Sequence, residues 1–167
     1  LEIGYVPIVT RQEKSPTKVR VFVLAGQSNM EGYGTIEDPE NDPGSLIDVI
    51  QKDTAGNWSE IGEVGKWNTV EGASLYFARN QDTIRTKVTI GQGAYPDLIG
   101  AELMFAHQLD AFYDDPVLII KTAWGGKSLA VDFRPPSAGG ETGAYYNAMI
   151  KTVQDVPHNL NTEFPAL

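Results

Sequence analysis

Residues 19–32, with the sequence VRVFVLAGQSNMEG, constrain the fold of this chain more than any other stretch. The first seven of them are almost all apolar and rich in β-branched side chains, which is typical of a strand buried on both faces of a parallel sheet. Gly26 permits a tight turn after this strand, and Ser28 and Asn29 suit the start of a helix. We therefore expect a central strand over residues 19–25 that leads directly into a helix.

This arrangement places the hydroxyl of Ser28 at the carboxyl end of a strand, where open α/β sheets bind their ligands. The free N–H groups at a helix start, together with the positive end of the helix dipole, stabilise an anion that develops beside them. Ser28 is therefore a candidate nucleophile. The same spacing fits a purely structural role, in which the Ser28 side chain only caps the helix.

The residues around Ser28 resemble a known sequence block. Residues 24–32, LAGQSNMEG, are similar to the first block of the SGNH (GDSL-like) hydrolases, in the form typical of the sialate O-acetylesterase-like branch and carbohydrate esterase family six. The resemblance covers about residues 19–167. It implies that Ser28 is the catalytic nucleophile and that the neighbouring Gln27 contributes to substrate binding.

The family resemblance also implies a fold and an activity. The fold would be a flavodoxin-like α/β fold, with helices in layers on both sides of a central parallel sheet. The activity would be that of a serine esterase that removes O-acetyl groups from carbohydrates of the acetylxylan or sialate type, through an acetyl-serine intermediate. Such a reaction needs no metal or organic cofactor. A different class of function remains open, namely a non-catalytic carbohydrate-binding or truncated remnant of this fold.

A second apolar run, VLIIKTA at residues 117–123, predicts another strand, and WGGKSL follows it. A glycine without a side chain beside the Ser28 turn lets a backbone N–H approach a substrate carbonyl. This stretch is also similar to the second family block, whose glycine contributes to the oxyanion hole. The resemblance therefore implies oxyanion donors at the amides of Ser28 and of Gly125 or Gly126, and the sequence leaves both glycines open.

The histidine that would activate the serine is harder to find. Asp155 and His158 have the Asp-x-x-His spacing of the last SGNH block, where the carboxylate orients the histidine. However, Asp155 falls within an amphipathic pattern over residues 144–156 that predicts a packing helix, which Pro157 would end or kink. We therefore expect a helix here, with an extended catalytic loop as the alternative.

His107 is the other histidine of the sequence. Apolar residues recur at helical spacing over residues 99–109 and predict an amphipathic helix that ends before Asp114. We therefore expect His107 to be a surface or partly buried polar residue of that helix, without a catalytic role.

The sequence predicts too few strands for a complete family core. The candidates for parallel strands are residues 19–25, part of 83–90, and 117–123, whereas the family fold needs about five strands. The third family block, which resembles Trp-x-Gln-Gly-x-x-Asp, is also missing. We therefore predict that the chain is the amino-terminal part of a catalytic unit. In this interpretation strand 117–123 forms an exposed apolar edge, and a second chain or a missing carboxyl-terminal segment covers it and supplies the Asp and His.

The remaining segments are less informative. Residues 1–18 form a leader or edge segment, and residues 19–167 form the esterase-type domain. Residues 34–56 are rich in Pro, Asp, Gly and Asn and predict a surface excursion, with a short strand or turn over 45–52. Trp58 and Trp67 are expected to anchor loops on the core, with sugar stacking as the alternative.

Arg134 lies in a Pro-rich loop over residues 131–137, which we expect to cross the carboxyl edge of the sheet. Its guanidinium is a candidate for binding sugar hydroxyls or a substrate carboxylate. A surface ion pair is the alternative.

Charge and composition exclude several classes of function. Twenty-two acidic against thirteen basic residues give a net charge of −9, without a basic cluster, so nucleic acid and anionic membrane are poor partners. The chain has no apolar run of about 18 residues that would span a membrane. It has no cysteine and only two histidines, which excludes disulfides, thiolate metal sites and histidine-rich metal sites.

Overall fold

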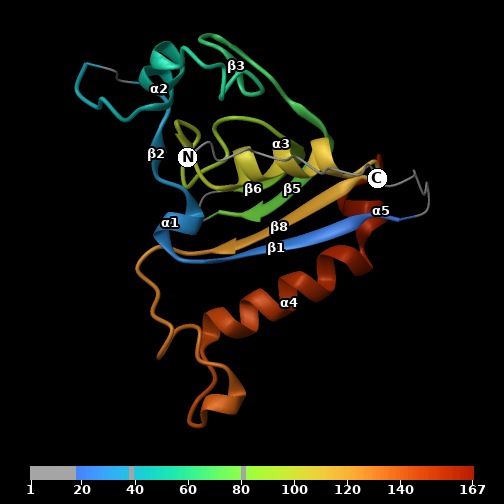
Figure 1. The fold of residues 1–167 in the computed structure, drawn as a ribbon. Helices are drawn as coiled ribbons and strands as arrows, with labels where there is room; N and C mark the ends of the chain where they lie inside the picture. The colour runs from blue at the N-terminus through green and yellow to red at the C-terminus, as the bar shows by residue number, and fades with distance from the viewer. Residues whose placement is uncertain (1–17, 38–39, 80–81) are drawn as a thin grey trace, which may run out of the picture.

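The computed structural model, which describes residues 18–37, 40–79 and 82–167, is built on a four-stranded sheet. Its strands lie in the order β1 (Arg20–Gly26), β8 (Val117–Ala123), β5 (Val70–Ala78) and β6 (Thr83–Val88) (Figure 1). β1 and β5 both run parallel to β8, whereas β6 runs antiparallel to β5. The prediction of an α/β fold with a mostly parallel central sheet is confirmed.

The two longest helices pack on opposite faces of this sheet (Figure 1). α3 (Glu102–Phe112) covers one face, where Val117 and Ile119 join its core. α4 (Ala144–His158), followed by α5 (Leu160–Glu163), covers the other, where Leu118 and Ile120 point. β8 therefore contributes alternate side chains to both cores, and all seven of its residues are buried.

Several shorter elements lie around the sheet. They are α1 (Ser28–Glu31), β2 (Gly34–Thr35), α2 (Leu46–Lys52), β3 (Gly62–Glu63), β4 (Lys66–Trp67), β7 (Leu98–Ile99) and the 3₁₀ helix η1 (Pro136–Ala138). β2 pairs with β7 and β3 with β4, each in antiparallel fashion. Trp58 and Trp67 pack against the core on the α3 side, as expected of loop anchors. In the described part of the chain, every helix is too short or too polar to cross a membrane.

The positions of the two apolar strands differ from the prediction. β1 pairs only with β8 among the described strands, so it lies at the edge of the sheet and not at its centre. Its side chains alternate in exposure, and Val21 and Val23 are 43% and 42% exposed. β8 is not an edge strand, because β1 and β5 flank it on both sides. The expectation that residues 117–123 form an exposed edge was wrong.

Three local expectations also need correction. The sequence analysis missed β5, because Gly72 and polar neighbours interrupt its apolar pattern and the strand carries an irregularity between Val70 and Ser74. β6 is antiparallel and does not belong to the parallel set. Within residues 45–52, where a short strand or turn was predicted, Leu46–Lys52 form helix α2, whose first turn is capped by the Ser45 hydroxyl, which accepts from the Asp48 N–H at 3.3 Å. The predicted leader falls almost entirely in residues 1–17, outside the described residues.

Candidate active site

Ser28 lies in the turn between β1 and α1, at the carboxyl end of the parallel strands, as predicted. Gln27 precedes it at the N-cap position of α1, and its carbonyl accepts hydrogen bonds from the amides of Met30 and Glu31. The Ser28 side chain makes no capping bond to the helix. Its Oγ instead donates to Oε1 of Gln27 over 3.2 Å. The capping interpretation is therefore wrong, and the hydroxyl is available at the surface of the turn.

The loop after β8 lies beside this turn. β8 pairs with β1 in a register that sets Ala123 opposite Gly26, and the Trp124 N–H donates to the Gly26 carbonyl at 3.1 Å. A methyl group added to Gly125 would lie 3.9 Å from Cβ of Ser28, so the Gly125 backbone lies next to the serine. A methyl group on Gly126 would meet no atom within 4 Å, although its φ of +72° disfavours any side chain.

Glu31 is a site residue that the sequence analysis missed. Its side chain is only 2% exposed, and its Oε2 accepts a hydrogen bond from the Gly125 N–H at 2.6 Å. The Tyr33 hydroxyl hydrogen-bonds to the same carboxylate; burial of that hydroxyl and the negative charge of Glu31 raise the pKa of Tyr33. The sequence position of Glu31 could have indicated this role, because a residue three places after Ser28 lies on the same side of a helix.

A buried ion pair joins α3 to β8, the strand that precedes the glycine loop. Nζ of Lys121, on β8, lies 2.7 Å from Oε2 of Glu102, and both side chains are at most 1% exposed. Lys121 also donates to the Gln92 carbonyl at 3.3 Å, and Glu102 accepts from the Gly100 amide at 3.0 Å. Burial lowers the pKa of Lys121, whereas the Glu102 carboxylate opposes that shift. The pair fixes the start of α3 and the loop around Gln92 to the strand that carries the glycine loop.

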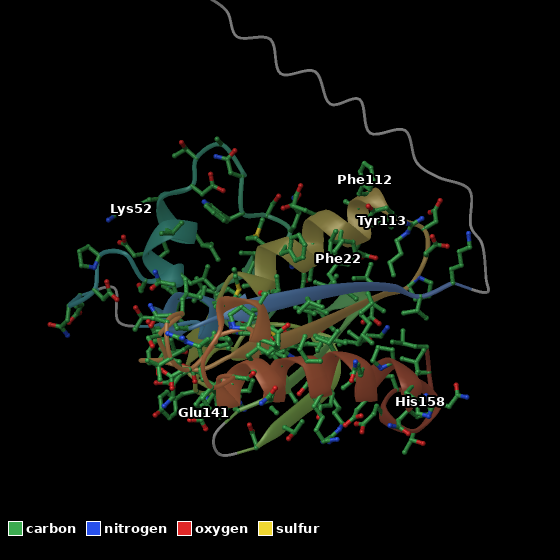
Figure 2. All side chains as sticks on the ribbon, turned by 90° about the horizontal axis from the view of Figure 1, so that it is seen from below. Phe22, Lys52, Phe112, Tyr113, Glu141 and His158 are labelled. Atoms are coloured by element: carbon green, nitrogen blue, oxygen red, sulfur yellow. The ribbon has the colours of Figure 1, made fainter. Side chains whose placement is uncertain are left out.

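Neither histidine contacts Ser28. His107 lies on α3, as expected, and its Nε2 is buried without a hydrogen-bond partner in the described residues. Burial lowers the pKa of His107. His158 ends α4 at the end of the sheet where β1 begins, whereas Ser28 follows the other end of β1 (Figures 1 and 2). Asp155 lies within the same helix and pairs with Lys151, so the predicted helix is confirmed and the Asp-x-x-His loop is not formed.

Arg134 forms no ion pair among the described residues, so the alternative of a surface ion pair is wrong, and its role in substrate binding stays a prediction. Its Nε donates to the Ala130 carbonyl at 2.7 Å, and one terminal nitrogen donates to the Gly139 carbonyl at 2.9 Å. The guanidinium therefore holds together the loop that carries Arg134. No cluster of three or more His, Cys, Asp or Glu side chains suited to a metal ion occurs among the described residues.

An apolar pocket of about 580 Å³ adjoins the serine turn on the α4 side of the sheet. It is lined by residues from the end of β1, the loops that follow β8, and α4: Ala25, Gly26, Gln27, Lys127, Leu129, Phe133, Pro135, Tyr146 and Met149. Gln27 therefore faces both this pocket and the Ser28 hydroxyl.

Residues 18–163 match the model of a protein family described as "carbohydrate esterase, sialic acid-specific acetylesterase". No curated protein and no solved structure matches the chain. The matched region contains the serine turn, the glycine loop and all four strands of the sheet.

Proposed function

Because the chain belongs to this family of carbohydrate esterases, we propose that it carries the nucleophile of a serine esterase that removes O-acetyl groups from carbohydrates. One observation carries the proposal. A serine hydroxyl at the carboxyl end of β1 lies against a glycine backbone at the end of the neighbouring parallel strand. The wider assignment to a flavodoxin-like SGNH fold belongs to the same proposal.

The reaction follows from these groups. Oγ of Ser28 attacks the acetyl carbonyl carbon while a base takes its proton. The negative charge that develops on the carbonyl oxygen is held by the Ser28 N–H, which has no acceptor in the described part of the chain, and by an amide of the Gly125–Gly126 loop. Collapse expels the sugar oxygen, which takes a proton from the protonated base, and water then hydrolyses the acetyl-serine.

The base is the missing component. Oε1 of Gln27 accepts the Ser28 hydrogen bond, but an amide oxygen is too weakly basic to take the proton. Both histidines of the sequence are held elsewhere, one on α3 and one at the far end of α4. We propose that a further polypeptide segment, from a second chain or a longer precursor, supplies an oriented Asp–His pair.

The edge of β1 that no described strand pairs with suits such a segment. A strand with one unpaired edge accepts a further strand readily, and the half-exposed Val21 and Val23 offer it an apolar surface. The apolar pocket beside Gln27 continues this surface toward Ser28. A segment that covered the β1 edge and this pocket would therefore lie next to Ser28. The edge that we propose for this segment is therefore that of β1, and not that of strand 117–123, which the sequence predicted.

Hydrolysis of a chromogenic acetyl ester by the wild-type chain and by Ser28→Ala tests the proposal. Imidazole is added to both proteins to replace the missing base. We expect imidazole to increase hydrolysis by the wild type beyond the rate that imidazole gives with Ser28→Ala. Equal rates for the two proteins in imidazole would support the alternative of a non-catalytic carbohydrate-binding remnant.

A further inference from the structure

The carboxylate of Glu31 is buried beside the serine turn, between two hydrogen-bond donors. Its Oε2 accepts from the Gly125 N–H at 2.6 Å, and the Tyr33 hydroxyl donates to the same carboxylate. Glu31 is only 2% exposed and forms no ion pair among the residues that the structure describes. A buried charge without an ion-pair partner is costly, so these two donors hold the carboxylate in place.

The short bond from Gly125 to Glu31 occupies the Gly125 amide. Hydrogen bonds from N–H to oxygen usually measure about 2.9–3.0 Å, and those to a charged acceptor are shorter and roughly twice as strong. An oxyanion formed at Ser28 would compete with the carboxylate for the same N–H, and the two negative charges would repel each other. The Gly125 amide is therefore committed to Glu31 and is a poor donor to a substrate.

The next amide of the loop, that of Gly126, has no acceptor in the described part of the chain. A methyl group on Gly126 would meet no atom within 4 Å, so the space beside this residue is open to a substrate. Gly125, which precedes it, lies next to Ser28, because a methyl group there would be 3.9 Å from Cβ of the serine. The Gly126 N–H is thus the amide of this loop that an oxyanion at Ser28 can take.

Glu31 acts on the site through the backbone and not through the Ser28 hydroxyl. The Ser28 Oγ donates to Oε1 of Gln27 at 3.2 Å, whereas the Glu31 carboxylate takes the Gly125 N–H. The Glu31 N–H donates to the Gln27 carbonyl at 2.8 Å, so the carboxylate and the serine turn belong to the same short helix. The contact of Glu31 with Gly125 therefore sets where the glycine loop lies relative to the serine.

We infer that Glu31 and Tyr33 are positioning residues of the esterase reaction. They hold the Gly125 N–H, so that the Gly126 N–H is the one that the loop offers to the oxyanion. This inference rests on the proposed esterase function and adds two residues to it. The Tyr33 hydroxyl fixes the Glu31 carboxylate, and the carboxylate fixes the peptide that leads to the donor. Removal of either group should displace the donor without removing it.

Steady-state kinetics with a chromogenic acetyl ester test the inference. Imidazole again replaces the base, because His158 lies at the end of α4, as Figure 2 shows. We expect Glu31→Ala to lower kcat by about ten- to a hundredfold, since a displacement of about 1 Å costs up to about 10²-fold. KM should change little, because an oxyanion donor acts on the transition state. Glu31→Gln, which keeps an acceptor oxygen, should restore most of kcat, and Tyr33→Phe should lower it less than Glu31→Ala does.

Tyr95→Phe is the matched control for Tyr33→Phe. Tyr95 is as exposed as Tyr33, 50% against 51%, and the two rings meet edge to face. The Tyr95 hydroxyl makes no hydrogen bond to Glu31 among the described residues, so this variant should keep the wild-type kcat. Thermal melting shows which variants are folded at the assay temperature. Unchanged kcat in folded Glu31→Ala or Tyr33→Phe would remove that residue from the proposal, and an equal loss in Tyr95→Phe would overturn the role of Tyr33.

The amide protons of the loop report its geometry without turnover. In NMR spectra of the isotope-labelled wild-type chain, we expect the Gly125 amide proton far downfield, as a short bond to a carboxylate requires. Glu31→Ala should move this proton upfield and speed its exchange with solvent at least about tenfold, whereas Glu31→Gln should have a smaller effect. A Gly125 amide that is the same in Glu31→Ala and in the wild type would overturn the inference.

A phosphonate adduct on Ser28 identifies the donor. The Ser28 oxygen replaces the fluoride of a fluorophosphonate, and the phosphoryl oxygen of the adduct stands in for the oxyanion. We expect the adduct to move the Gly126 amide proton downfield and to leave that of Gly125 in place. Movement of the Gly125 proton instead would overturn the inference and leave the esterase proposal intact. Absence of both the adduct and Ser28-dependent hydrolysis would refute the esterase proposal, on which the inference rests.

Discussion

The backbone N–H of Gly125 donates a 2.6 Å hydrogen bond to the buried carboxylate of Glu31. This contact joins the helix that follows β1 to the loop that follows β8, and so holds the glycine loop against the Ser28 turn. It also distinguishes the two glycines. An oxyanion that takes the Gly125 amide must displace a carboxylate, whereas the Gly126 amide has no such partner in the described part of the chain.

Removal of this carboxylate should destabilise the protein. Glu31→Ala leaves the Gly125 amide without an acceptor in a partly buried position, which costs about 1–3 kcal/mol. Glu31→Gln keeps an acceptor oxygen and should cost less. Urea unfolding of both variants measures the effect, with Glu71→Ala as the control on an exposed position of β5. If Glu31→Ala were as stable as the control, the contact would not hold the loop.

The glycine loop should matter for turnover. Gly125→Ala places a methyl group 2.9 Å from Oε2 of Glu31 and beside Ser28, and should lower imidazole-supported hydrolysis by ~10²–10³ if this amide is an oxyanion donor. Gly126→Ala meets open space, so a comparable loss there would assign the donor to Gly126. Thermal melting of both variants separates a local effect on catalysis from unfolding. Unchanged turnover in both variants would rule out this loop.

The buried pair of Lys121 and Glu102 should be important for stability. Lys121→Met leaves the Glu102 carboxylate buried without its cation, and we expect a loss of about 3–5 kcal/mol in the free energy of unfolding. The double variant with Glu102→Gln should recover part of that loss. Lys151→Met is the matched control, because its pair with Asp155 is exposed and such pairs contribute about 0–1 kcal/mol. Equal losses in the two single variants would contradict this account.

His107 should make stability depend on pH. Burial lowers its pKa in the folded protein below the value of about 6.5 that it has in the unfolded chain. As the pH falls below about 6.5, the unfolded chain therefore binds the proton first, and stability decreases until the pH passes the lowered folded pKa. The midpoint of urea unfolding, measured at about pH 7.5 and pH 5, should fall less for His107→Gln than for the wild type.

His158→Gln serves as the control for that measurement, because His158 is exposed at the end of α4. This variant should retain the wild-type decrease. If His107→Gln also retained it in full, the decrease would arise from carboxylates and not from His107.

The sequence predicted the elements with strong local signals. The strands around residues 19–25 and 117–123 were found because each is a nearly continuous apolar run, and the helices α3 and α4 because their apolar residues repeat at helical spacing. The serine turn was found for the same reason, since it directly follows such a strand. Asp155 was correctly placed on a helix because the amphipathic pattern over residues 144–156 includes it, whereas the helix continues through Pro157 to His158, where the sequence predicted an end or a kink.

The order of the strands could not be predicted, because it depends on contacts between distant segments. β5 enters the sheet between β8 and β6 despite the interruption at Gly72, whose backbone approaches the Asp110 side chain too closely for a Cβ. Its insertion buries β8 completely and leaves β1 at the edge. Glu31 escaped notice because a charged residue usually indicates a solvent-exposed position. Its burial depends on the Gly125 amide, which lies 94 residues away in the sequence.

The central claim, that Ser28 is the nucleophile, is tested most directly by chemical labelling. The wild-type chain and Ser28→Ala are incubated with a serine-directed fluorophosphonate in the presence of imidazole, and the modified residue is mapped by mass spectrometry. We predict one modification, on the peptide that contains Ser28, which imidazole accelerates and which Ser28→Ala lacks. Modification of other serines at the same rate in both proteins, with Ser28 itself unmodified, would contradict the account.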